Sequence, residues 1–137
     1  MICVFGAGGD RDRGKRPLMG EAAARLSDTV LVTSDNPRSE DPEAIIAEIM
    51  VGATAAASER RAGAGSGAVE LRAVPDRREA IAQAVSAGGR GDVVVIAGKG
   101  HEQGQELAGG RRVPFDDVSV ARAALGGRSA AVAEASA

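Results

Sequence analysis

Aromatic side chains are almost absent: the 137 residues include two phenylalanines and no tryptophan or tyrosine. Proteins that bind single-stranded nucleic acids stack bases on aromatic side chains, and this chain has no such set. Basic residues do not dominate either, because the formal net charge is −2. These two features argue against a nucleic-acid partner. The hydrophobic core must therefore be built from alanine, valine, isoleucine and leucine.

Cysteine and histidine each occur once, as Cys3 and His101. A single cysteine cannot form an internal disulfide, and the apolar run around Cys3 predicts a buried thiol. A histidine without a second histidine or cysteine argues against a zinc site, so we predict no metal site. No apolar stretch approaches the roughly 20 residues of a membrane helix, and the N-terminus lacks the features of a signal peptide. We expect a cytoplasmic protein with no membrane partner.

The sequence does contain an alternation of strand and helix patterns. Strands are expected over residues 2–5, 29–33, 69–74 and 92–97, and helices over 17–26, from 41 onward, 76–86 and 116–125. A surface loop is expected over 58–68 and a hairpin over 106–113. This alternation predicts an α/β fold, a Rossmann-like three-layer sandwich with a mostly parallel sheet flanked by helices. We expect one domain over residues 1–127 and a disordered tail over 128–137.

Apolar spacing predicts which face of each element is buried. In the first helix the residues spaced by four, which should form its inner face, are Leu18, Ala22 and Leu26. In the second helix, which Asp41 should cap at its N-terminus, the apolar stripe consists of Ile45, Ile46, Ile49 and Met50. The strand over 92–97 has no polar alternation, so both of its faces should be buried.

Three unusual loops follow the predicted strands, beginning at Gly6, Ser34 and Gly98. In open parallel sheets the binding crevice lies at the carboxyl ends of the strands, where these loops should meet. The first loop almost matches two phosphate-binding motifs. However, Arg11 replaces the third glycine of the dinucleotide fingerprint, and Arg16 replaces the Ser or Thr of a P-loop, so we reject a P-loop within this chain.

The side chains of these loops complement a zwitterionic ligand. Arg11 and Arg38 offer planar guanidinium groups that suit carboxylates, and Glu102 can receive an ammonium group. Gly98 allows close approach to the backbone. Lys99 is either a cation for an anionic group or a solvated side chain. An ordinary polar turn remains the alternative for each loop taken alone.

The three loops together resemble the C-terminal domain of UDP-N-acetylmuramoyl-tripeptide synthetases, in the Mur ligase family. The matching segments are Gly8-Gly9-Asp10-Arg11-Asp12-Arg13-Gly14-Lys15-Arg16-Pro17, Asp35-Asn36-Pro37-Arg38 and Ala97-Gly98-Lys99-Gly100-His101-Glu102. The resemblance runs from about Ile2 to Leu125. It implies the C-terminal part of an ATP-dependent ligase of peptidoglycan synthesis that adds meso-diaminopimelate to a UDP-N-acetylmuramoyl dipeptide.

The resemblance also implies roles for individual residues. The predicted diaminopimelate contacts are Arg11, Asn36, Arg38, Gly98 and Glu102, with Asp35 and Pro37 shaping the second loop. Asp10 would contact the nucleotide ribose. The family binds ATP and Mg²⁺ mainly in a central domain that this sequence does not contain, and the dipeptide through the domains missing here. We therefore expect the isolated chain to be inactive.

Three alternatives stay open at this point. The chain could belong to a ligase for lysine or another diamino acid, but lysine lacks the distal carboxylate that Arg38 would bind. It could be a binding module for a nucleotide or an amino acid without catalysis. It could also belong to a related folate-type glutamate ligase, although the second and third motifs argue against that reading.

Overall fold

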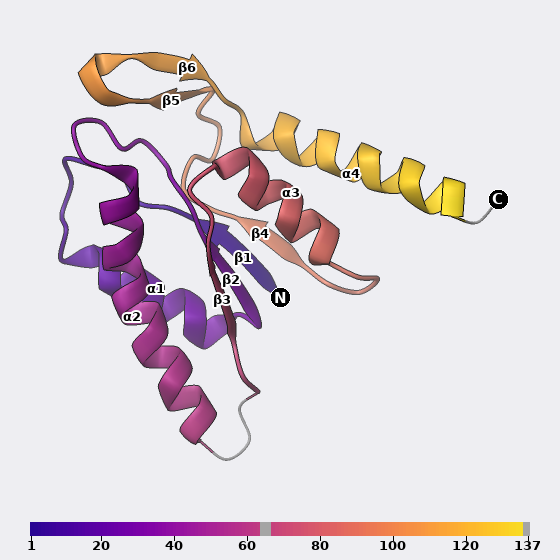
Figure 1. Ribbon diagram of the computed structural model, residues 1–137, viewed down its shortest axis with the longest axis horizontal. Coiled ribbons are helices and arrows are strands. Elements are labelled where there is room, and N and C mark those ends of the chain that lie inside the picture. Colours follow the sequence, from indigo (N-terminus) through magenta and orange to yellow (C-terminus); the bar gives the residue numbers. More distant parts are fainter. Residues whose placement is uncertain (64–66, 136–137) are drawn as a thin grey trace.

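The computed structural model describes residues 1–63 and 67–135, and four parallel strands form its central sheet. They are β1 (Ile2–Phe5), β2 (Thr29–Val32), β3 (Glu70–Ala73) and β4 (Val94–Ile96). Their spatial order is β3-β2-β1-β4. A separate antiparallel hairpin of β5 (Gly104–Glu106) and β6 (Arg112–Pro114) lies beyond the carboxyl ends of the parallel strands (Figure 1). The hairpin turns through the short helix η1 (Ala108–Gly110).

Helices cover both faces of the sheet and complete three layers (Figure 1). Helices α1 (Lys15–Leu26) and α2 (Pro42–Ala62) cover one face, and α3 (Arg77–Ala87) and α4 (Asp117–Ala135) cover the other. The strand residues alternate between the two cores: Phe5 faces α1 and α2, whereas Val4 faces α3. The predicted α/β three-layer fold with a parallel sheet is confirmed.

The second helix agrees closely with its sequence pattern. Asp41 caps α2, because its side chain accepts a hydrogen bond from the backbone N–H of Glu43. Ile45, Ile46 and Ile49 are all at most 4% exposed. The helix extends to Ala62, so residues 58–62, which were expected in a loop, are helical, and residues 64–66 lie outside the described residues.

The predicted inner face of α1 is wrong. Leu18 and Leu26 are 63% and 73% exposed, and the buried residues of the helix are Arg16, Gly20 and Ala24. The cause is a backbone contact with α2, because a Cβ atom on Gly20 would lie 2.1 Å from the carbonyl oxygen of Ile49. Two helices can approach this closely only through small residues, so the leucines lie on the outside.

The prediction that both faces of the fourth strand are buried is also wrong. β4 is an edge strand: its residue Val95 is 37% exposed, and Val93, just before the strand, is 58% exposed. Helices α1 and α2 pack over β2 and β3, and they leave the corresponding side of β4 open. Cys3, which pairs with Val95 in the sheet, is only partly buried, and this burial raises the pKa of its thiol.

Helix α4 is longer than its sequence pattern indicated. It continues past Leu125 to Ala135 through Gly126 and Gly127, which had suggested an end. The surrounding alanines are the strongest helix formers, and they offset the helix-breaking tendency of the two glycines. The disordered tail over 128–137 stays a prediction. None of the helices in the described part of the chain is long and apolar enough to cross a membrane.

Candidate ligand-binding site

The loops that follow β1 and β2 touch through their backbones. The N–H of Gly9 donates to the carbonyl oxygen of Asn36 at 2.8 Å. A Cβ atom at Gly9 would lie 1.8 Å from the carbonyl oxygen of Pro37, so only glycine fits there. Pro37 therefore contributes its backbone to this contact, and the sequence Gly9-Asp10-Arg11 is held against the second loop.

The second loop is also fixed by the β5–β6 hairpin. The amide nitrogen of Gln105 donates to the carbonyl oxygen of Asp35 at 2.5 Å, and the backbone N–H of Glu106 donates to Oδ1 of Asn36 at 2.9 Å. The backbone N–H of Arg38 donates to the carbonyl oxygen of Glu106 at 3.2 Å. The sequence pattern predicted a hairpin near these residues but gave no sign that it supports the loop.

Arg38 adopts a backbone conformation that non-glycine residues rarely take, with φ of 52°. Its Nη1 donates to the carbonyl oxygen of Gly9 at 2.7 Å, and its Nε donates to Glu106 at 3.1 Å. The guanidinium thus bridges the first loop and the hairpin while 24% of its side chain stays exposed. These contacts orient a guanidinium that retains donors for an anionic ligand.

The third loop contributes Glu102 and two glycines in the left-handed region. Oε2 of Glu102 accepts a hydrogen bond from Nδ2 of Asn36 at 3.0 Å, and its side chain is 49% exposed. Gly98 has φ of +118°, a conformation that is strained for any L side chain. This turn, which glycine adopts without strain, brings Glu102 back to the second loop, where its carboxylate contacts Asn36.

A cavity of about 480 Å³ opens between the first loop, α1 and the strand ends. Three of the sequence-predicted residues line it: Arg11, Asp35 and Gly98. Lys15 and Asp12 also line it, so its wall contains both charge signs. Asn36, Arg38 and Glu102 do not line it: Asn36 and Arg38 are hydrogen-bonded to Gly9 of the first loop, and Glu102 to Asn36. The predicted contact residues for diaminopimelate therefore gather at one end of the sheet.

Asp10 is occupied by protein contacts. Its carboxylate accepts hydrogen bonds from the hydroxyl of Ser39 at 2.5 Å and from the backbone N–H of Ser39 at 3.3 Å. Its own N–H donates to Glu40 at 2.7 Å. The predicted role of Asp10 in binding a ribose stays a prediction, and in this structure the residue joins the first loop to the start of α2.

The buried Arg16 also joins the first loop to the segment around the start of α2. It is 1% exposed and donates to both carboxylate oxygens of Glu40, at 2.8 Å each, and to Glu48 at 2.8 Å. The Arg16 guanidinium, helped by the backbone N–H of Asp10, lowers the pKa of Glu40 from 4.5 to about 2. The residue that occupies the Ser/Thr position of a P-loop is thus a structural cation.

Arg77 and Asp117 form a second buried ion pair behind the loops. Nε and Nη2 of Arg77 donate to the two carboxylate oxygens of Asp117 at 2.8 and 2.7 Å. The same guanidinium donates to the carbonyl oxygen of Ser34 at 3.3 Å and of Ala97 at 3.0 Å. Arg77 therefore links the ends of β2 and β4. Sequence reasoning missed it because its partner lies 40 residues away.

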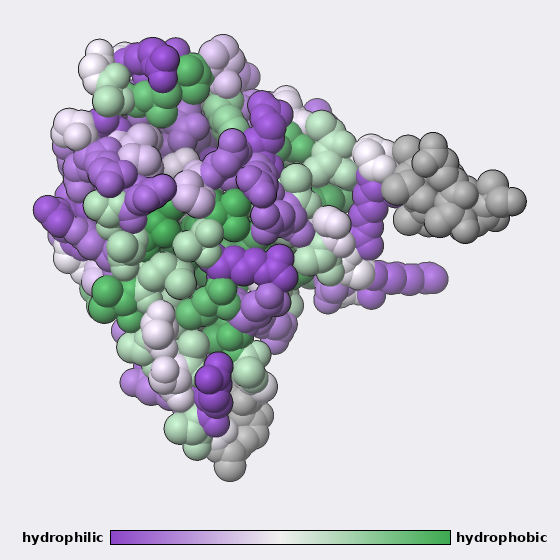
Figure 2. Space-filling view, in the orientation of Figure 1, coloured by the Kyte–Doolittle hydropathy of each residue, from purple (hydrophilic) through white to green (hydrophobic). Residues whose placement is uncertain are grey.

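The surface of the molecule reflects this distribution of charge. Hydrophilic side chains predominate at the end that carries the loops, whereas more apolar atoms reach the surface over the elements below (Figure 2). No group of histidine, cysteine, aspartate and glutamate within the described ranges could hold a metal ion.

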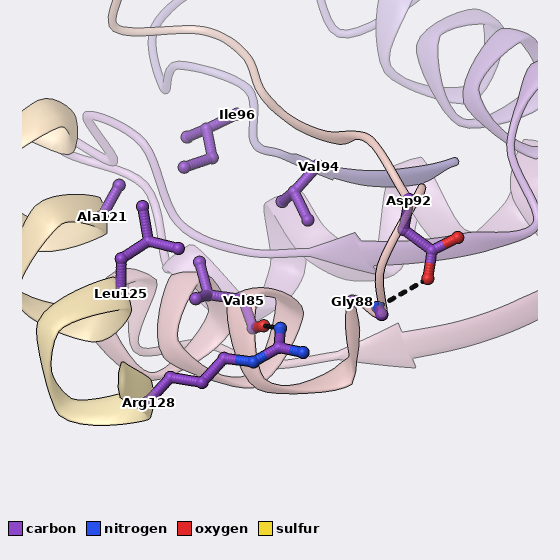
Figure 3. A pocket seen from close by; sticks show the side chains of 9 residues that line it. Val85, Gly88, Asp92, Val94, Ile96, Ala121, Leu125 and Arg128 are labelled. Carbon is purple, nitrogen blue, oxygen red and sulfur yellow. Dashed lines mark hydrogen bonds between the residues drawn. The ribbon is translucent and has the colours of Figure 1, made fainter. Parts of the chain in front are cut away.

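A second hollow lies away from the loops, between α3, β4 and α4 (Figure 3). It has a volume of about 290 Å³, and its mainly apolar wall includes Val85, Val94 and Ile96. Arg128 closes one side by donating to the carbonyl oxygen of Val85 at 2.7 Å. None of the residues predicted from the sequence as ligand contacts lines this hollow.

Sequence and structure comparisons match this chain to one group of known proteins. A sequence model of the family described as "Mur ligase, glutamate ligase domain" matches residues 1–100. The chain is 55% identical over 126 residues to the UDP-N-acetylmuramoyl-L-alanyl-D-glutamate–2,6-diaminopimelate ligase of Acidovorax sp. (strain JS42), covering 92% of this chain and 23% of that protein. It is 54% identical over 128 residues to the ligase of the same name from Syntrophomonas wolfei, covering 93% of this chain and 24% of the relative.

A solved structure of a protein with the same name shares the fold. It superimposes with a TM-score of 0.76 at 46% identity, covering 93% of this chain and 24% of the solved chain. The present chain thus spans about a quarter of the length of the curated relatives it matches.

Proposed function

The chain belongs to the Mur ligase family, and from this premise we propose that it forms the amino-acid-binding domain of a ligase that adds meso-diaminopimelate. The acceptor would be UDP-N-acetylmuramoyl-L-alanyl-D-glutamate, in peptidoglycan synthesis, as the names of the relatives state for those proteins. The observation that carries the proposal is the meeting of the three loops at the carboxyl ends of β1, β2 and β4.

The charges of these loops support a ligand with several ionised ends. Diaminopimelate has two carboxylates and two ammonium groups. Arg11, in the cavity wall, and Arg38, at the second loop, supply guanidinium groups for carboxylates. Asp35 in the cavity wall and Glu102, held by Asn36, supply carboxylates for ammonium groups. Pro37 shapes the loop, and Gly98 leaves room for the ligand beside the backbone.

ATP and Mg²⁺ are proposed to bind mainly outside this chain. The described residues provide no cluster of metal ligands, and Arg16, at the sequence position of the P-loop Ser or Thr, is paired with Glu40 and Glu48. The UDP-N-acetylmuramoyl dipeptide is likewise proposed to bind to other parts of a longer ligase. Within this proposal the present chain holds and orients the incoming amino acid.

Calorimetric titration of the chain with meso-diaminopimelate, with L-lysine as the control ligand, tests the proposal. We expect binding of diaminopimelate and at least about tenfold weaker binding of lysine, because one lost charge-assisted hydrogen bond is worth roughly 1.5–3 kcal/mol. Equal binding of both ligands would contradict the assignment to diaminopimelate and favour a ligase for another diamino acid.

Arg38→Ala is expected to weaken diaminopimelate binding by about ten- to a hundredfold, because it removes a guanidinium that suits a ligand carboxylate. Arg25→Ala is the matched control, since Arg25 pairs with Glu21 and Glu59 on the outside of α1 and α2. The affinity of the Arg25 variant should equal that of the unmodified chain. An Arg38 variant with unchanged affinity would remove Arg38 from the site.

A further inference from the structure

Lys99 lies under the site and has no access to solvent. Its side chain is 0% exposed. Nζ lies 2.9 Å from Oδ1 of Asp35, 2.9 Å from Oδ1 of Asn36 and 3.0 Å from the carbonyl oxygen of Gly104. An ammonium group has three hydrogens, and three oxygen atoms surround it here. The solvated alternative for Lys99 is therefore wrong: Lys99 is an internal cation that forms an ion pair with Asp35 and donates hydrogen bonds to Asn36 and Gly104.

Two of the surrounding contacts fix the orientation of the Asn36 side chain. Its Oδ1 receives hydrogen bonds from Nζ of Lys99 and from the backbone N–H of Glu106, both at 2.9 Å. If the amide were flipped, its NH₂ group would face an ammonium group and a backbone N–H, and all three are donors. The amide is therefore held with its oxygen inward and its nitrogen outward.

The outward nitrogen of this amide holds Glu102. Nδ2 of Asn36 donates to Oε2 of Glu102 at 3.0 Å, whereas Nζ of Lys99 lies 3.9 Å from the same oxygen, beyond hydrogen-bonding distance. Glu102 stands on a loop with two glycines in the left-handed region, Gly98 and Gly100. Its half-exposed side chain thus depends on Asn36 for its place, and Asn36 depends on Lys99.

We propose that Lys99 is a positioning residue, which sets Glu102 for the ammonium group of the ligand by fixing the Asn36 amide between them. This inference rests on the proposed function. It assigns Asn36 a defined polarity, because one N–H of the amide holds Glu102 and the other is left to a ligand acceptor. Lys99 itself does not touch the ligand, but the orientation of the Asn36 amide and the position of the Glu102 carboxylate depend on it.

Lys99→Met, made in the 137-residue chain, tests whether Lys99 fixes the Asn36 amide. We expect the side-chain amide hydrogens of Asn36, followed by nuclear magnetic resonance, to exchange with water at least about tenfold faster in this variant. Affinity for meso-diaminopimelate should fall by about tenfold or more. Arg90→Met is the matched control, since it removes an exposed cation from the turn between α3 and β4 and should change neither value.

A second pair of variants keeps the test decisive if Lys99→Met does not fold. Asn36→Asp preserves the oxygen that faces Lys99 but puts a carboxylate against Glu102, so unfolding in urea should require less denaturant. Adding Glu102→Gln supplies an amide that can donate to this new carboxylate, so the hydrogen bond forms again with donor and acceptor exchanged. The urea midpoint should therefore recover. Diaminopimelate binding should not recover with it, because the anion for the ammonium group is gone.

The outcomes separate this inference from the proposed function. If the unmodified chain binds no diaminopimelate, the proposed function fails for this chain, and the Asn36 exchange rates and urea midpoints still decide the role of Lys99. If the chain binds and a folded Lys99→Met variant shows the same affinity and the same Asn36 exchange, the positioning role is overturned. A double variant no more stable than Asn36→Asp would also overturn it.

Discussion

Charged side chains are buried at the carboxyl ends of the strands, whereas large apolar side chains are exposed on α1 and β4. At the strand ends, Arg16, Arg77 and Lys99 are only 1 to 3% exposed. Leu26 of α1 and Val95 of β4 are 73% and 37% exposed. The usual order of a globular protein, apolar inside and charged outside, is thus locally reversed in both regions.

The two reversals have different causes. Each buried cation is surrounded by acceptors from separate loops, so its burial follows from the need to hold those loops in one arrangement. A buried charge is tolerated only when it is paired in this way. The exposed leucines of α1 have no such partners. They lie outside because Gly20 and Ala24 occupy the only side of the helix that can approach its neighbours closely.

The largest effect is expected from breaking the Arg77–Asp117 pair. Arg77→Met leaves the carboxylate of Asp117 buried without its counter-ion and removes the donors to Ser34 and Ala97. Breaking a buried pair from one side typically costs about 3–5 kcal/mol. Urea unfolding should show a loss of this size. A double variant, Arg77→Met with Asp117→Leu, should be more stable than Arg77→Met alone, since no unpaired charge remains.

A loss below about 1 kcal/mol for Arg77→Met would contradict the role of this pair. It would mean that water reaches Asp117 and that burial of charge at the strand ends contributes little. The comparison between the two regions would then rest on Arg16 and Lys99 alone.

A smaller loss is expected on the packed side of α1. Gly20→Ala places a methyl group where the carbonyl oxygen of Ile49 lies 2.1 Å away, so α1 and α2 must move apart. Overpacking of this kind costs about 1–3 kcal/mol. Gly126→Ala is the matched control, because no atom lies within 4 Å of a Cβ atom at that position of α4. The control should gain about 0.5–1 kcal/mol from helix propensity, measured by thermal or urea unfolding.

Much of the fold followed from local patterns, since Asp41 marks the start of α2 and the alternating elements require a parallel sheet. The same alternation brought the three loops to one end and so located the candidate site, where the roles of Arg11, Asn36, Arg38 and Glu102 remain predictions. The buried face of α1 could not be predicted from the sequence, because apolar spacing does not reveal a glycine contact between helices.

The internal cations were beyond sequence reasoning for a related reason. Lys99 follows a strand in a glycine-rich loop, which is the usual setting of an exposed lysine. Its partners Asn36 and Gly104 come from another loop and from the hairpin, 63 and 5 residues away. Only the folded chain shows that these acceptors surround it.

Acidification should weaken the Arg16–Glu40 connection by a modest amount. The pKa of Glu40 in the folded chain is about 2, lowered from 4.5, so the native state binds fewer protons than the unfolded state. The stability that this pair supplies is fully present above about pH 4.5 and is lost as the pH falls towards about 2. Over this pH range, the free energy of unfolding measured in urea should fall less steeply for Glu40→Gln than for the unmodified chain. An identical dependence would show that the ion pair does not form.

The smallest effect is expected from the exposed apolar side chains. Leu26→Gln at the end of α1 should change the free energy of unfolding by no more than about 0.5 kcal/mol, because a side chain that is 73% exposed buries little surface on folding. Leu31→Ala in β2 provides the scale: that leucine is 0% exposed, and its truncation should cost about 2–5 kcal/mol. A Leu26 variant that loses stability on the scale of Leu31 would show that α1 packs through its leucines, as their spacing suggested, and would remove the contrast between the two regions.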